Sequence, residues 1–161
     1  MGRVAIALGS NVGDRRAHLD YAVTALRALL TNLAVSRYYD TVPVGVSGPQ
    51  AMFLNAAAVG ETTLAPRALL EALLAIEQER GRERPYLNAP RTLDLDLILA
   101  GDTVLEEPGL VLPHPRFRER RFVLEPLAAV APELRDPVSG RTVAELLAAA
   151  AAAGAAGRDG A

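Results

Sequence analysis

Residues 93–99 read Leu93-Asp94-Leu95-Asp96-Leu97-Ile98-Leu99, an alternation of leucine and aspartate that ends in three consecutive apolar residues. A period of two predicts a β-strand, because successive side chains of a strand point to opposite faces of the sheet. Asp94 and Asp96 then share one face, with Cα atoms roughly 6.5 to 7 Å apart at a rise of ~3.3 Å per residue. The stretch therefore predicts a strand that brings two carboxylates together.

The elements before this strand predict the fold. Strands are expected over residues 4–8, 33–39 and 53–62, and helices over 15–30 and 66–81. The first helix has apolar residues at i, i+3, i+4 and i+7, and the second lies between Pro66 and Gly81. The order strand, helix, strand, strand, helix, strand is that of a ferredoxin-like unit. We therefore predict an α+β protein, a βαββαβ sandwich whose antiparallel sheet carries both helices on one face.

The residues after this unit predict helical additions that cover one end of the sheet. An extended piece over 106–113 precedes short helix candidates over 115–121 and 122–130 and a last helix from Thr142. The alanine-rich run before residue 154 favours helix, and 154–161 are expected to form a disordered tail. Since the 161 residues contain no repeat and no long linker, a single domain over 1–153 is expected.

Composition excludes several classes of protein and of mechanism. No apolar run reaches the ~18 residues that span a bilayer, and no secretory signal is recognisable, so a cytoplasmic protein is expected. The chain has no cysteine, and its 17 basic residues are all arginine. Thiolate metal sites, cysteine nucleophiles and lysine bases are thereby excluded, and any metal should be held by carboxylates. The net charge of −2 argues against a surface that coats nucleic acid.

Arginines lie on both sides of the aspartate strand in the sequence. Arg80, Arg82, Arg84 and Arg91 precede it, and Arg116, Arg118, Arg120 and Arg121 follow it beside His114. Guanidinium groups bind phosphate oxygens bidentately, and Mg²⁺ prefers oxygen ligands. Two carboxylates between two such clusters favour a site for a metal and a polyphosphate, as phosphoryl transfer requires. Taken separately, the alternating strand and each cluster could also be ordinary solvated surface.

Other candidate residues each have a structural alternative. Glu77 could face the same end of the sheet or be an ordinary exposed glutamate. His114, held between two prolines, could donate a hydrogen bond to a phosphate or nucleotide, whereas His18 is expected at the surface. The residues that could contact a flat ring are Phe53, Asn55 and Phe122, although both phenylalanines would by default belong to the core.

The segment Pro90-Arg91-Thr92-Leu93-Asp94-Leu95-Asp96-Leu97-Ile98 closely resembles the signature of the 6-hydroxymethyl-7,8-dihydropterin pyrophosphokinase family. Further matches follow in the family's order between residues 4 and 147: Ala7-Leu8-Gly9-Ser10-Asn11, Tyr39-Asp40-Thr41, Phe53-Leu54-Asn55-Ala56-Ala57, Ile76-Glu77, Gly81-Arg82, Leu112-Pro113-His114-Pro115 and Arg120-Arg121-Phe122-Val123-Leu124-Glu125-Pro126-Leu127. The resemblance implies a ferredoxin-like fold and an enzyme of folate biosynthesis. It would transfer the terminal diphosphate of ATP to the hydroxymethyl group of the pterin and release AMP.

The resemblance also implies roles for individual residues. Asp94 and Asp96 would hold two Mg²⁺ ions that bridge the phosphates of the co-substrate ATP, with Asp94 also near the attacking hydroxyl. Arg82 and Arg91 would complete the catalytic set by neutralising charge on the diphosphate. The residues expected to bind ATP are Glu77, Arg84, Arg91, Leu97, His114 and Arg120. Those expected to bind the pterin are Thr41, Val44, Phe53, Asn55, Asp94 and Phe122, with the phenylalanines stacking on the ring.

By the same resemblance, residues 41–50 and 82–90 would close over both substrates and exclude water. The second of these loops departs from the family, because 86–89 replace an arginine-tryptophan-glycine run of many members and the loop is one residue shorter. A monomer acting on small molecules, without nucleic acid or membrane, is expected. Two alternatives stay open: a ferredoxin-like RNA-binding module, for which 4% aromatic residues is little, and a metal-nucleotide-binding domain without catalysis.

Overall fold

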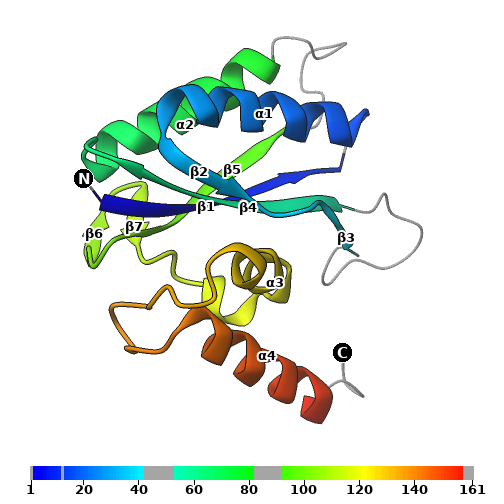
Figure 1. Ribbon diagram of the computed structural model, residues 1–161, viewed down its shortest axis with the longest axis vertical. Coiled ribbons are helices and arrows are strands. Elements are labelled where there is room, and N and C mark those ends of the chain that lie inside the picture. The colour runs from blue at the N-terminus through cyan, green and yellow to red at the C-terminus, as the bar shows by residue number, and fades with distance from the viewer. Residues whose placement is uncertain (1, 12, 42–52, 82–91, 158–161) are drawn as a thin grey trace.

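A computed structural model describes residues 2–11, 13–41, 53–81 and 92–157, in which an antiparallel sheet lies between helices on both faces (Figure 1). The strands are β1 (Gly2–Ser10), β2 (Thr31–Val35), β3 (Tyr39–Thr41), β4 (Phe53–Thr62) and β5 (Asp94–Ala100). Their order is β2-β4-β1-β5, with β3 as a further partner of β4. Helices α1 (Arg15–Leu29) and α2 (Pro66–Gly81) cover one face. This arrangement confirms the predicted ferredoxin-like α+β fold.

The first core lies between α1, α2 and the sheet. Leu26 of α1 and Leu69 of α2 are fully buried there against Ile6 and Leu8 of β1. Burial of each such side chain contributes about 1.5 to 3 kcal/mol. The Leu-Asp alternation of β5 directs Leu95 and Leu97 into this same core. The two aspartates consequently lie on the other face of the sheet, as the alternation predicts.

The second face of the sheet is covered by the C-terminal elements, and here the prediction that they cover one end of the sheet is wrong. The 3-10 helix η1 (Phe117–Glu119) and α3 (Arg121–Val130) pack against the sheet, and α4 (Val143–Gly157) packs on α3 (Figure 1). Small residues of the sheet, Ala5 and Ala57, let Leu124 and Leu127 of α3 approach closely. The reason is visible in β4, whose residues 54–60 are all buried. A strand buried on both faces requires cover on both.

Several local expectations are also corrected. The strand expected over 33–39 is interrupted, because Ser36 leaves the strand and exchanges two hydrogen bonds with Ala57, one from its own N–H and one to its Oγ. The extended piece over 106–113 is a hairpin of β6 (Leu105–Glu107) and β7 (Leu110–Leu112), with Gly109 at a φ of 78° in its turn. Helix α4 continues to Gly157, and 158–161 lie outside the described residues, so the disordered tail stays a prediction.

His18, which was expected at the surface, is buried at the contact of α1 with α2. Its exposed fraction is 9%, and its Nδ1 accepts a hydrogen bond of 2.9 Å from Nε of Arg80. The guanidinium of Arg80 also lies 5.0 Å from the ring centre of Tyr21. The prediction was wrong because the partner that covers His18 is on another helix, 62 residues away in the sequence.

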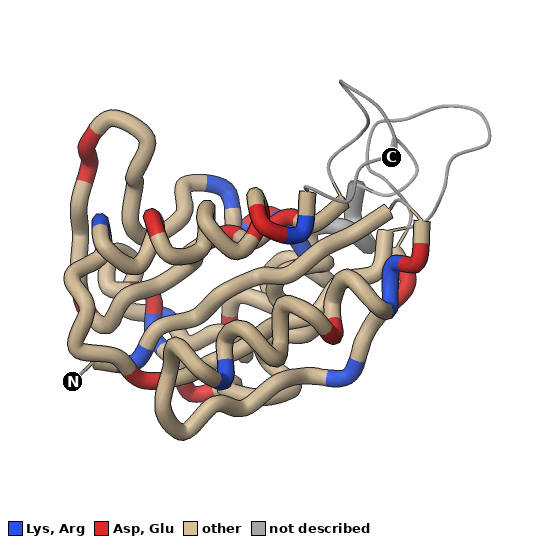
Figure 2. The backbone as a smooth tube through the Cα atoms, turned by 90° about the horizontal axis from the view of Figure 1, so that it is seen from above, with Lys and Arg blue, Asp and Glu red and all other residues tan. Residues whose placement is uncertain are grey.

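Figure 2 shows that the acidic and basic positions of the described residues are interspersed along the backbone. No helix in the described ranges is both long enough and apolar enough to cross a membrane.

Candidate active site

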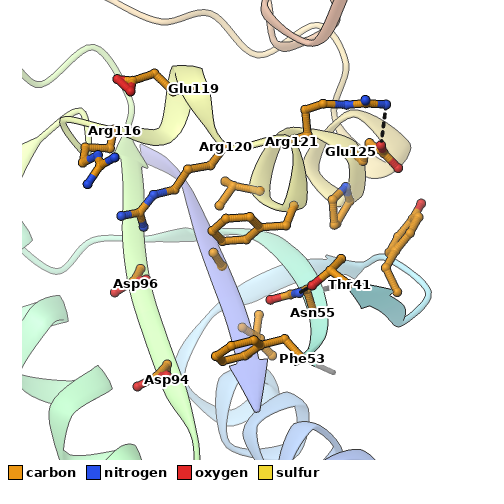
Figure 3. A pocket seen from close by; sticks show the side chains of 17 residues that line it. Thr41, Phe53, Asn55, Asp94, Asp96, Arg116, Glu119, Arg120, Arg121 and Glu125 are labelled. Atoms are coloured by element: carbon orange, nitrogen blue, oxygen red, sulfur yellow. Dashed lines mark hydrogen bonds and ion pairs between the residues drawn. The ribbon is translucent and has the colours of Figure 1, made fainter. Parts of the chain in front are cut away.

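A cavity of about 970 Å³ lies between the second face of the sheet and the start of α3 (Figure 3). This volume is at the upper end of the ~300–1,000 Å³ typical of small-molecule sites. Seven residues to which the resemblance gives a role in the site line it: Thr41, Phe53, Asn55, Asp94, Asp96, Arg120 and Phe122. The fold therefore brings together residues that are up to 81 positions apart in the sequence (from 41 to 122).

The two aspartates are the first and third residues of β5. Asp94 is half-buried and Asp96 is exposed, and Figure 3 shows both side chains pointing the same way from the strand. Their partners on β1 are Gly9 and Ala7, so no large side chain of the neighbouring strand covers the carboxylates. Both aspartates consequently present their oxygens to the cavity.

This donor set fits a magnesium ion bound together with phosphates. Among the described residues, no group of three or more His, Cys, Asp or Glu side chains could enclose a metal ion. Mg²⁺ does not need such an enclosure, because it is commonly bound by one or two carboxylates and completes its shell with water and substrate phosphates. Asp94 and Asp96 thus have the chemistry and the space for that mode of binding.

The arginine cluster around position 118 is divided by the structure. Arg116 and Arg120 line the cavity, and Figure 3 shows Arg120 directed from the start of α3 toward Asp96. Arg118 turns away and pairs with the buried Asp136, with an Nη2 to Oδ1 distance of 2.9 Å. Arg121 lines the cavity but forms an ion pair of 3.1 Å with Glu125. Arg116 and Arg120 are therefore the described cations best placed for an anionic substrate.

His114 lies beside this end of the cavity. Its backbone N–H donates to Ile98 of β5 at 2.9 Å, and its Nδ1 accepts the N–H of Arg116 at 3.2 Å. Burial lowers the pKa of His114, and the charges of Arg120 and Arg116 lower it further, against the opposing charge of Asp96. The imidazole is therefore neutral at neutral pH. Because Nδ1 accepts, the proton is on Nε2, which is available as a donor.

The opposite end of the cavity is suited to a flat polar ring. Phe53 and Phe122 are half-buried and line it, and the guanidinium of Arg120 lies 5.6 Å from the ring centre of Phe122. Asn55 is 6% exposed, and its Nδ2 donates to Oγ1 of Thr41. Figure 3 shows Asn55 and Thr41 across the cavity from the aspartates, with Phe53 between them. An aromatic face and a fixed amide are thus available at the same place.

The remaining predicted site residues are not in this cavity or cannot be placed. Glu77 lies on α2 and accepts the backbone N–H of Leu95 at 2.6 Å. Leu97 is 5% exposed and packs in the first core, so its contact with a nucleotide stays a prediction. Four predicted residues lie outside the described ranges, together with the two loops expected to close over the substrates: Val44, Arg82, Arg84 and Arg91.

Eight lining residues were not named as site candidates from the sequence: Ala7, Leu8, Gly9, Tyr39, Glu119, Val123, Glu125 and Pro126. Arg116 and Arg121, which also line the cavity, belong to the arginine cluster that the sequence placed beside the aspartate strand. Part of this group could have been found. Phe122, Glu125 and Pro126 are spaced i, i+3 and i+4, so they share one face of α3. Tyr39 is two residues before Thr41 in β3 and therefore points to the same face of the sheet.

The chain matches the model of a family described as 7,8-dihydro-6-hydroxymethylpterin-pyrophosphokinase over residues 5–132. A 2-amino-4-hydroxy-6-hydroxymethyldihydropteridine pyrophosphokinase of Pseudomonas aeruginosa is 46% identical over 149 residues, which are 91% of each chain. The Bacillus subtilis protein of the same name is 45% identical over 140 residues, 85% of this chain and 83% of that one.

Similarity of fold extends to more distant proteins. The crystal structure of wild-type Plasmodium falciparum HPPK-DHPS is similar with a TM-score of 0.74 at 15% identity. The match covers 92% of this chain and 44% of that longer one. At this identity the likeness shows the fold alone, and it agrees with the βαββαβ arrangement described above.

Proposed function

The chain belongs to the 7,8-dihydro-6-hydroxymethylpterin-pyrophosphokinase family. On this premise we propose that the protein catalyses, in this cavity, the transfer of the terminal diphosphate of ATP to 6-hydroxymethyl-7,8-dihydropterin. The acceptor is the hydroxymethyl oxygen, and AMP is the leaving group. The protein is accordingly a pyrophosphokinase of folate biosynthesis. The comparisons favour this activity over the RNA-binding and the purely binding alternatives.

The observation that carries the proposal is the arrangement of three kinds of group around one cavity. Asp94 and Asp96 lie on one side, Arg120 approaches from the start of α3, and Phe53 lies toward the ring end. Diphosphate transfer requires neutralised phosphate charge and a nucleophile held in line. An apolar ring site next to a metal and phosphate site satisfies both requirements for a pterin alcohol.

At the phosphate end, Asp94 and Asp96 would hold magnesium, with two ions as our proposal. Bound there, Mg²⁺ supplies charge neutralisation and orientation of the phosphates. Arg120 and the Nε2–H of His114 would bind ATP oxygens, which their positions beside Asp96 support. From the resemblance, the remaining catalytic and ATP-binding roles are proposed for Arg82, Arg84, Arg91 and Leu97.

At the ring end, Phe53 and Phe122 would stack on the two faces of the pterin. Asn55, fixed by its hydrogen bond to Thr41, would pair with the polar edge of the ring. Val44 is proposed as a further contact from the resemblance. In Figure 3 Asp94 lies on the side of Phe53 and Asp96 on the side of Arg120, which supports our proposal that the Asp94 carboxylate is the one near the hydroxymethyl group. We also propose that residues 1–153 form one domain that acts as a monomer on these small molecules.

The test is release of AMP from ATP and Mg²⁺, with and without 6-hydroxymethyl-7,8-dihydropterin. We expect AMP only with the pterin, and we expect Asp96→Asn to lower kcat by at least ~100-fold, because a charged group that stabilises the transition state is removed. Asp102→Asn is the matched control, since Asp102 is exposed in the turn after β5, away from the cavity. Pterin-dependent turnover of Asp96→Asn at the wild-type rate would refute the site.

A further inference from the structure

At the outer edge of β5, a side chain accepts a hydrogen bond from the strand's backbone. β5 is the last strand in the sheet order, and its only strand partner in the described part of the chain is β1. In an antiparallel pair, alternate residues direct their N–H groups away from the partner strand. Leu95 is such a residue, and it is 4% exposed. Its N–H therefore needs an acceptor within the protein.

Glu77 provides this acceptor from α2. Its Oε2 accepts the Leu95 N–H at 2.6 Å. Glu77 is half-buried and lies one turn before the end of the helix. Its side chain does not line the cavity that contains the two aspartates. Glu77 is therefore connected to the strand that carries the two aspartates without being part of the cavity wall.

We propose that Glu77 is a positioning residue, which sets the direction of the Asp94 and Asp96 carboxylates by fixing the Leu95 amide. The Leu95 nitrogen belongs to the planar peptide unit that begins at the Asp94 carbonyl. Rotation of this unit would turn the Asp94 side chain and shift the next pleat, which carries Asp96. Asp94 is the first residue of β5, so only one side of it is held by strand pairing.

A second contact shows that the approach to Asp94 is anchored from both sides. Oγ of Ser10, at the end of β1, donates to the Thr92 carbonyl at 2.6 Å. Asp94 is therefore bracketed by one anchor two residues before it and by the Glu77 anchor one residue after it. Without these two anchors, the start of β5 would be positioned beside the cavity only by its pairing with β1.

This inference rests on the proposed function in one respect, namely that the aspartates bind a divalent metal with ATP. It differs from the direct contact with ATP that the family resemblance implies for Glu77. A positioning residue affects the metal more than the nucleotide, whereas a direct contact weakens nucleotide binding with or without metal. The two roles can therefore be separated by measuring both affinities.

The experiment compares Glu77→Ala, Glu77→Gln and the control Glu71→Ala, which removes an exposed carboxylate from the same helix. Mn²⁺ is titrated by the electron paramagnetic resonance of the free ion, in the presence of a non-hydrolysable ATP analogue. For Glu77→Ala we expect Mn²⁺ affinity to fall ~10-fold or more, as for other residues that orient metal ligands. Glu77→Gln should stay within about threefold of wild type, because its amide oxygen still accepts the Leu95 N–H. Glu71→Ala should not differ from wild type.

Two further readouts do not depend on turnover. The affinity for the analogue without metal should be unchanged in Glu77→Ala. In ¹⁵N-resolved NMR spectra, the Leu95 amide should be protected from exchange in wild type and in Glu77→Gln, and should exchange faster in Glu77→Ala. Wild-type Mn²⁺ affinity in Glu77→Ala would overturn the proposal, and so would an equal loss of metal-free nucleotide affinity. Failure of the wild type to form AMP would refute the proposed function while leaving these binding comparisons valid.

Discussion

Gly9 shows how a single residue shapes the ring end of the cavity. It is paired with Asn55 on β4 and with Asp94 on β5, so it lies between the two functional ends of the site. A Cβ atom at this position would be 3.1 Å from Oδ1 of Asn55, which is closer than an ordinary van der Waals contact. Glycine is therefore favoured here because it leaves room for the neighbouring amide, and not because of a special backbone conformation.

We expect Gly9→Ala to raise the KM for the pterin roughly fivefold, which corresponds to one neutral hydrogen bond of about 1 kcal/mol. The added methyl group displaces the Asn55 amide but leaves the ATP end of the cavity unchanged. Steady-state kinetics with each substrate varied in turn would measure the effect. Gly2→Ala, in open space at the other end of the same strand, is the control. An unchanged KM for the pterin would exclude Asn55 as a ring contact.

The sequence predicted site residues well where the spacing within one element decides their direction. Asp94 and Asp96 share a face because a strand has a period of two, and the structure places both at the cavity. The sequence could not separate Arg116 and Arg120 from Arg118. All three precede α3, but Arg118 is withdrawn by Asp136, which lies 18 residues further along the chain. Such a long-range partner leaves no local signal.

At the scale of elements, the pair Arg118–Asp136 joins η1 to the connection between α3 and α4. Asp136 is 0% exposed, and besides Arg118 it accepts hydrogen bonds from Ser139 Oγ at 2.7 Å and Val138 N–H at 3.0 Å. Burial alone would raise the pKa of Asp136. The hydrogen bonds from Arg118, Ser139 and Val138 outweigh burial and hold that pKa well below its usual range.

Asp136→Asn should lower the free energy of unfolding at pH 7 by about 2 to 3 kcal/mol. The expected loss is less than the ~3–5 kcal/mol for breaking a fully buried pair, since the Arg118 side chain is 28% exposed. The carboxyl titrates near its ordinary value of 3.8 in the unfolded chain and lower in the folded one. Its stabilisation is therefore complete above about pH 5 and is lost as the pH falls below 4, by up to ~1.4 kcal/mol per pH unit.

Urea unfolding of wild type and Asp136→Asn at pH 7, 5 and 3 would measure this dependence. The difference between the two proteins should be the same at pH 7 and 5 and smaller at pH 3. A difference that is equal at all three values would mean that the carboxylate has no depressed pKa in the folded state. The matched exposed variant is Asp102→Asn, which should have the wild-type free energy of unfolding at pH 7.

Element boundaries could be predicted where the chain itself contains the stop signal. α2 begins at Pro66 and ends at Gly81, as its flanking residues predict, and β4 covers the expected residues. The break after β2 was not predictable, because it depends on the hydrogen bonds between Ser36 and Ala57 of another strand. The cover on the second face could have been inferred from the apolar run of β4, which has no solvent-facing residues at alternate positions.

For the whole molecule, the two faces of the sheet have different roles. The core under α1 and α2 stabilises the βαββαβ unit, whereas the core under α3 also forms one wall of the cavity. The site is therefore a junction between the ferredoxin-like unit and its C-terminal addition. A substitution in the second core should disturb the site in proportion to its effect on α3. A substitution in the first core on α1, away from Glu77 of α2, should not.

Two buried leucines allow this difference to be measured. Leu26 on α1 and Leu124 on α3 are both 0% exposed, one in each core. Replacement of either by alanine should lower the free energy of unfolding by a similar ~2 to 5 kcal/mol, since the same atoms are removed from a packed interior. Leu124→Ala alone should also lower the affinity of the folded protein for an ATP analogue and for the pterin. The reason is that Arg120 and Phe122 lie at the end of α3 that this substitution displaces. Titration calorimetry at a temperature where both variants are folded would give the affinities. Wild-type affinities in both variants would mean that the cavity wall keeps its geometry independently of the core beneath α3. Equal losses of affinity in both variants would mean that the two faces are coupled through the sheet.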